Sequence, residues 1–140
     1  MGLRAQISPR IGIVMTLTSQ VILEDEVRRN GTFVEMSIGL PWFRSLRLSH
    51  IVGLTASVNG GEPAPVEMLI NDSWLSIESL TQYAELEWYP QDRQTIRFVE
   101  AASEFDLYLS FVLLMPNLFM GPQNPVVIHT SATQRVSLVN

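Results

Sequence analysis

The chain has 140 residues, of which 46% are hydrophobic and 16% charged, and its formal net charge is −5. This length predicts one domain spanning residues 1–140, large enough to bury a core without disulfides or structural metals. All nine basic residues are arginines, which excludes a Schiff-base or Walker lysine, and the acidic balance argues against binding to nucleic acid or an anionic membrane surface.

Cysteine is absent, so disulfides, thiolate nucleophiles and zinc–thiolate sites are excluded. The longest apolar run, at 111–115, is too short to span a bilayer, and residues 1–14 lack the apolar core of a signal peptide. We therefore predict a cytoplasmic protein. The mean hydropathy of +0.18 is high for a lone soluble domain, which is explained either by apolar surface that a partner covers or by a large core alone.

Period-two alternation of apolar and polar residues dominates the chain and predicts β-strands. One strand is predicted at 20–27. Further strands are predicted where apolar and polar residues alternate, at 34–40, 54–58, 86–88, 96–98 and 105–113. Turn residues recur about every ten positions, at Asn30-Gly31, Asn59-Gly60-Gly61, Asn71-Asp72-Ser73, 90–93 and Pro116-Asn117. Residues 76–83 are helix-compatible, with Ser76 as the cap and Glu78 in the first turn. We predict an all-β fold, an antiparallel, jelly-roll-like β-sandwich with at most one short helix.

The segment 40–49 combines aromatic and basic residues in a predicted loop. Pro41 ends the preceding strand, and Trp42, Phe43 and Arg44 follow it. Tryptophan and arginine anchor interfaces and also stack on sugars and flat rings. These three residues are therefore contact candidates, with Arg44 pairing either with a partner's carboxylate or with Asp92. The alternative is a loop that folds its aromatic rings back into the core.

The segment 113–120 stays apolar across a proline and abandons alternation. One interpretation is a buried crossover connection, because apolar runs are usually core. The other is a surface patch covered by a partner, which would place Leu118 and Phe119 at an interface.

Catalytic motifs are missing from the sequence. The two histidines, His50 and His129, are far apart and have no carboxylate at metal-ligand spacing. Ser49, His50 and Asp92 could be drawn as a triad, but no nucleophile elbow or other enzyme fingerprint accompanies them. The carboxylates at 85 and 87 share one strand face, which favours a solvated surface over an acid/base pair. We predict neither a catalytic residue nor a metal site in this chain.

Four motifs, in their order and spacing, resemble the β subunits of C-glycoside deglycosidases. They are Leu40-Pro41-Trp42-Phe43-Arg44 followed by Leu48-Ser49, then Val58-Asn59-Gly60, then Ser79-Leu80, and then Trp88-Tyr89 with Gln91-Asp92. The chain departs from the family at Asn59, where the family turn has Asp, a change that a turn tolerates. The resemblance covers about 21–115. Met15 aligns with the start of such subunits, which makes residues 1–14 either an N-terminal extension or the result of an upstream start.

The resemblance implies a heteromeric lyase that cleaves the C–C bond between sugar and aromatic aglycone in 3-oxo-C-glycosides, such as oxidised flavonoid C-glucosides. The 3-keto group acidifies the neighbouring C–H for elimination, a divalent metal (Mn²⁺) polarises the ketone, and a histidine moves the proton. The family places metal and base on a TIM-barrel α subunit. This chain would then be its structural partner, without a cofactor of its own.

Two other functions stay open from the residues alone. One is a free-standing carbohydrate-binding β-sandwich module, which would use the same aromatic residues. The other is a small lyase or hydrolase that uses His50 with Asp92 or Glu87. The residues predicted to form a partner interface or pocket wall are Trp42, Phe43, Arg44, Trp88, Asp92, Leu118 and Phe119.

Overall fold

The alternating segments of the sequence form two sheets and a short ribbon. The computed structural model describes residues 11–16, 22–40, 45–89, 91–117 and 121–138. Its elements are β1 (Ile11–Thr16), β2 (Ile22–Asn30), β3 (Phe33–Ile38), β4 (Leu46–Arg47), η1 (Leu48–His50), β5 (Ile51–Val58), β6 (Ala64–Pro65), β7 (Glu67–Ile70), β8 (Ser73–Ser76), η2 (Ile77–Gln82), β9 (Glu87–Trp88), β10 (Gln94–Val99), β11 (Glu104–Asn117) and β12 (Gly121–Ser137). The all-β prediction is confirmed.

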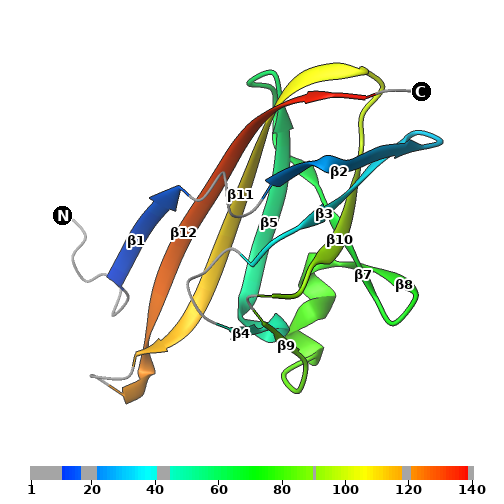
Figure 1. The fold of residues 1–140 in the computed structure, drawn as a ribbon. Helices are drawn as coiled ribbons and strands as arrows, with labels where there is room; N and C mark the ends of the chain where they lie inside the picture. The colour runs from blue at the N-terminus through cyan, green and yellow to red at the C-terminus, as the bar shows by residue number, and fades with distance from the viewer. Residues whose placement is uncertain (1–10, 17–21, 41–44, 90, 118–120, 139–140) are drawn as a thin grey trace.

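The described strands are arranged in a first sheet of order β1-β12-β11-β5-β6 and a second sheet of order β2-β3-β10-β7-β8, while β4 and β9 pair as a two-stranded ribbon (Figure 1). Every pairing among the described strands is antiparallel except that of β1 with β12, which is parallel from Ile11↔Val126 to Thr16↔Ser131. β1 is therefore the exception to the predicted antiparallel arrangement. Residues 11–14 of the predicted extension belong to this edge strand.

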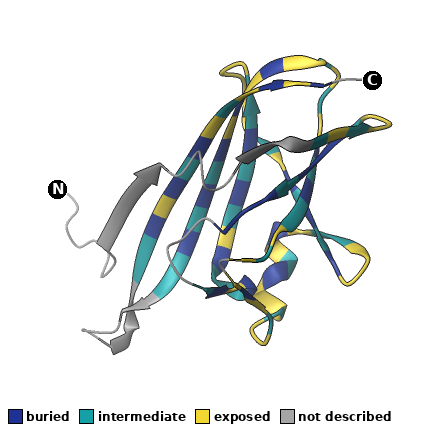
Figure 2. Cartoon of the chain, in the orientation of Figure 1, coloured by how far each residue is buried: buried dark blue, intermediate teal, exposed yellow. Residues whose placement is uncertain are grey.

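The core lies between the two sheets and follows the alternation in the sequence. The buried positions of β11 are Phe105, Leu107, Leu109, Phe111 and Leu113. Those of β3 and β10 are Val34, Met36, Ile38, Ile96 and Phe98, although β3 also buries Glu35. Phe98 and Phe105 meet edge to face across the sheets, with ring centroids 6.3 Å apart. Figure 2 shows the result as alternating bands of buried and more exposed residues along β5 and β11.

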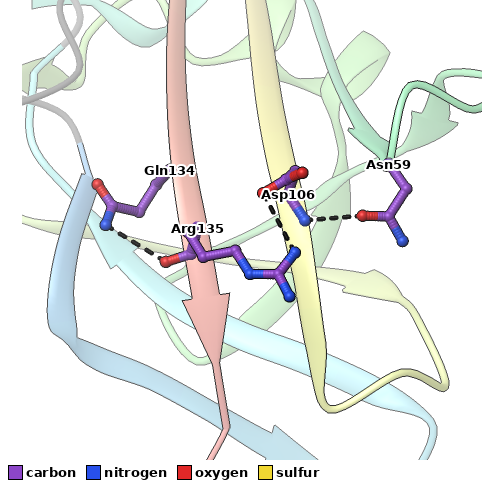
Figure 3. A network of polar contacts seen from close by, with 4 residues as sticks. All are labelled: Asn59, Asp106, Gln134 and Arg135. Carbon is purple, nitrogen blue, oxygen red and sulfur yellow. Dashed lines mark hydrogen bonds and ion pairs between the residues drawn. The ribbon is translucent and has the colours of Figure 1, made fainter.

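Two predicted turns adopt the left-handed backbone that their residue types favour. Asn59 and Gly60 have φ of 52° and 73°, and Asn71 and Asp72, between β7 and β8, have 49° and 67°. The Asn59 side chain also accepts a hydrogen bond from the backbone N–H of Asp106, 2.9 Å away. The Asp106 carboxylate pairs with Arg135 of β12 at 3.2 Å, so one polar network joins this turn to β11 and β12 (Figure 3).

The predicted short helix is present as a 3₁₀ helix, η2, and a second 3₁₀ turn, η1, precedes β5. Ser76 occupies the N-cap with an extended backbone, but its side chain makes no capping bond. Its hydroxyl instead shares a hydrogen bond with that of Ser79, at 2.8 Å, so the predicted side-chain cap is wrong. No helix in the described part of the chain has the length and apolarity to cross a bilayer.

The apolar run after Leu113 is a strand of a long hairpin. β11 continues through Pro116 to Asn117 and pairs with β12, and the register shifts between Met115 and Asn117. Proline has no N–H to donate to the ladder, which accounts for an irregularity at this point. The crossover interpretation and the turn predicted at Pro116-Asn117 are therefore wrong. Leu118 and Phe119 lie outside the described residues.

Candidate functional site

The ribbon of β4 and β9 joins two segments that the sequence marked as contact candidates. Leu46 pairs with Trp88 and Arg47 with Glu87, and the N–H of Leu48 donates to the carbonyl of Leu86 at 3.0 Å. In Figure 1 the ribbon lies beside the two 3₁₀ helices, at the end of the sandwich where β5 begins. The described segments 45–50 and 86–89 therefore meet at one end of the fold, which we call the ribbon end.

Trp88 is the buried anchor of this end. Its side chain is 0% exposed, and its indole Nε1–H donates to the backbone carbonyl of Asp92 at 3.1 Å. The N–H of Asp92 donates in turn to the carbonyl of Tyr89 at 3.0 Å, which closes the turn after β9. Trp88 thus holds this turn from the core and offers no surface of its own, while its neighbour Tyr89 is 44% exposed.

The remaining predicted contact residues divide into two groups. Asp92 is half-buried in the turn after β9. The other five lie outside the described residues: Trp42, Phe43, Arg44, Leu118 and Phe119. The suggested ion pair between Arg44 and Asp92 therefore also lies outside them. The described chain resumes at Ser45, directly before β4, so the 41–44 segment is attached to the ribbon end.

His50 is the last residue of η1, and its imidazole is partly buried beside Arg47. Its Nδ1 atom is buried and has no hydrogen-bond partner within the described part of the chain. Burial lowers the pKa of His50 below its usual value, and the positive charge of Arg47 lowers that pKa further. Both effects favour the neutral imidazole at neutral pH.

The acid/base arrangements considered from the sequence are not assembled in the described chain. No hydrogen bond joins the described side chains of Ser49, His50 and Asp92. Glu85 and Glu87 are both exposed, which confirms the solvated face. No three histidine, aspartate or glutamate side chains come close enough to hold a metal ion within residues 11–16, 22–40, 45–89, 91–117 and 121–138.

A second cluster, which the sequence did not indicate, surrounds Arg97 on β10. Its guanidinium carbon lies 4.0 Å from the ring centroid of Phe33 and 4.3 Å from that of Trp74. Its Nε atom pairs with the Glu67 carboxylate at 2.7 Å. These residues come from β3, β7, β8 and β10, and 30 positions separate Arg97 from Glu67 in the chain. The strand register that places them together is not readable from any local motif.

No protein-family model matches the chain. The chain is similar to the C-glycoside deglycosidase beta subunit of Arthrobacter globiformis, with 26% identity over 132 residues that cover 89% of this chain and 99% of that subunit. The resemblance to C-glycoside deglycosidase β subunits is confirmed. A β subunit of the same name from Microbacterium trichothecenolyticum is 22% identical over 129 residues, which cover 88% of this chain and 98% of that subunit. The similarity to these β subunits therefore runs along almost their whole length.

Proposed function

We propose that this chain is the small β subunit of a heteromeric C-glycoside deglycosidase. The observation that carries the proposal is the similarity to two proteins of that name over 99% and 98% of their length. The likeness thus extends over the whole subunit and is not confined to a shared segment. A β subunit works within an assembly, which agrees with the chain's high mean hydropathy of +0.18.

The assembly would act on 3-oxo-C-glycosides and cleave the C–C bond between sugar and aromatic aglycone by elimination. A carbonyl at C3 acidifies the neighbouring C–H, so a positioned base can remove that proton and a positioned acid can protonate the departing aglycone. The described residues of this chain form no set of three metal ligands. Following the family resemblance, the proposal assigns the divalent metal, Mn²⁺, and the base to a TIM-barrel α subunit, and no step is routed through this chain.

This chain would have a structural part, and the ribbon end is its proposed contact surface. Tyr89 presents an exposed aromatic ring there, and Arg47 and Glu87 present exposed charges. Trp88 fixes the position of Tyr89 from below, through the turn that its indole holds. Aromatic and arginine side chains supported by a rigid core are suited to anchoring an interface. Trp42, Phe43 and Arg44 lie outside the described residues, and on the family resemblance they are proposed as further contacts to the α subunit or the aglycone.

Co-expression with a TIM-barrel α-subunit candidate from the same genome tests the proposal. The two chains should co-elute in size exclusion, and the complex should release the aglycone from a 3-oxo-C-glucoside in the presence of Mn²⁺, while neither chain alone does so. The substitution Tyr89→Ser should weaken co-elution of the two chains. The control is Tyr108→Ser, which alters an equally exposed tyrosine on β11 and should leave co-elution unchanged. Activity of this chain alone, or chains that never associate, would refute the subunit role.

A further inference from the structure

A cleft is lined by residues of β3, β5, β6, β7 and β10 and by the start of η2. Its volume is about 580 Å³, within the range of small-molecule sites. The floor is apolar and buried, formed by Val66, Ile77 and Phe98. The rim includes exposed prolines, at 63 and 65, and Val99, which is 61% exposed. An apolar ligand face laid on this rim would remove exposed apolar surface from water, which is favourable.

The polar part of the cleft is held rigidly. Arg97 lines it, and Phe33 and Trp74 both stack on the guanidinium of Arg97. Glu67 also lines the cleft and accepts from Arg97 Nε at 2.7 Å. The side chains of Arg97 and Glu67 are 21% and 38% exposed, so both are fixed by neighbours and still reach solvent. A fixed donor group beside a fixed acceptor group costs little ordering entropy when a ligand binds.

The charges of the cleft select among ligands. Two carboxylates, those of Glu67 and Glu78, and one guanidinium, that of Arg97, are the charged groups of its lining. The guanidinium is already paired with Glu67, so an anion entering the cleft would meet an excess of negative charge. A neutral ligand with neighbouring hydroxyl groups fits better, because one hydroxyl can donate to the carboxylate while the next accepts from the guanidinium.

We propose that this cleft binds a neutral pyranose ring, with the C–H face of the sugar on the rim near Val99 and adjacent hydroxyls on Glu67 and Arg97. This inference goes beyond the proposed subunit function and does not depend on it, because every group that it uses belongs to this chain. It assigns the chain a sugar-binding surface apart from its proposed partner contacts. The Arg97 cluster is a binding group here and takes no part in chemistry.

Saturation-transfer NMR on the full chain, with phenyl β-D-glucopyranoside as the probe, tests the proposal. The pyranose C–H protons should receive the strongest transfer. Glu67→Gln removes the anionic acceptor at constant shape and should weaken binding by about tenfold. Its matched control is Asp106→Asn, which alters the exposed partner of Arg135, and this variant should bind the probe like the parent.

A second pair of variants leaves Phe33, Glu67, Trp74 and Arg97 themselves unchanged. Val99→Asp places a charge on the exposed rim and should abolish transfer to the sugar, whereas Val52→Asp, at an exposed valine outside the cleft, should not. Transfer confined to the phenyl ring, or sugar binding that survives both Glu67→Gln and Val99→Asp, would overturn the proposal. Loss of association with the α subunit would refute only the subunit role, since the probe experiment needs no partner.

Discussion

The ribbon end and the Arg97 cleft are stabilised in different ways. At the ribbon end a fully buried tryptophan and backbone hydrogen bonds hold a turn in place. At the cleft an ion pair and two aromatic rings hold one guanidinium that remains partly exposed to water. The first arrangement depends on packing, which salt does not weaken. The second depends on charge, which salt screens, and on stacking. The two regions should therefore respond to different kinds of substitution.

The largest expected effect is at Trp88. Trp88→Ala removes a fully buried ring and should lower the free energy of unfolding by about 3–5 kcal/mol. Urea denaturation followed by circular dichroism measures it. The control is Tyr89→Ala, the exposed neighbour on the same turn, which should cost less than about 1 kcal/mol. Equal losses in the two variants would mean that Trp88 is not the anchor of the ribbon end.

An intermediate effect is expected at Arg97. Arg97→Met removes the ion pair and both ring contacts and should lower the free energy of unfolding by about 1–2 kcal/mol. The matched variant Arg135→Met breaks a pair whose side chains are 59% and 72% exposed, and its cost should stay below about 0.5 kcal/mol. Denaturation of both variants in low and high salt would separate the contributions. A loss at Arg97 no greater than at Arg135 would contradict the comparison.

A smaller, pH-dependent effect is expected at His50. Because the pKa of His50 is lowered in the folded chain, the unfolded chain binds the proton more readily. Stability from this group is thus present above the ordinary histidine pKa of about 6.5 and is lost as the pH falls below it toward the lower folded pKa. His50→Asn should flatten this part of the stability profile, while His129→Asn, at an exposed position, serves as the reference. A parent profile that His50→Asn leaves unchanged would exclude this role.

The smallest effect on the free energy of unfolding is expected at Gly60. Its turn belongs to neither region and therefore serves as a reference for both. Gly60 has φ of +73° with open space where a Cβ would stand, so Gly60→Ala introduces backbone strain without a clash. The expected loss is about 1 kcal/mol, measured by thermal or urea unfolding. Gly53→Ala offers a contrast, because its Cβ would approach the Cβ of Val112 to 3.2 Å. If Gly60→Ala were neutral, the backbone of this turn would not be under the constraint described.

The sequence predicted the elements whose signal is local. Alternation in 105–113 corresponds to five buried side chains on β11, and the Asn-Gly turn after β5 adopts the expected backbone. β12 was missed although it has 17 residues, because its inward positions include Thr130 and Ala132 and carry a weak hydrophobic pattern. Thr130 is buried with no hydrogen-bond partner for its hydroxyl among the described residues, so its polarity conceals a core position.

At the candidate sites, too, the sequence did not predict where single side chains lie or which residues they contact. Alternation distinguishes Trp88, which is buried, from Tyr89, which is exposed, yet the contact candidates taken from the sequence included Trp88 and not Tyr89. Arg97 and Glu67 are 30 positions apart, and Phe33 lies on a third strand, so their contact depends on strand register. Register between distant strands is set by the packing of the whole core, which no short motif records.

The parallel edge strand β1 also constrains how the chain reaches its native state. Ile11 lies beside Val126, so the first described strand has its neighbour more than a hundred residues later in the chain. During synthesis β1 leaves the ribosome long before β12 does, and until then it has no native partner for its ladder. The first sheet can therefore be completed only after β12 has left the ribosome. Contacts of such sequence separation slow folding, and they leave the early strands exposed to aggregation in the meantime.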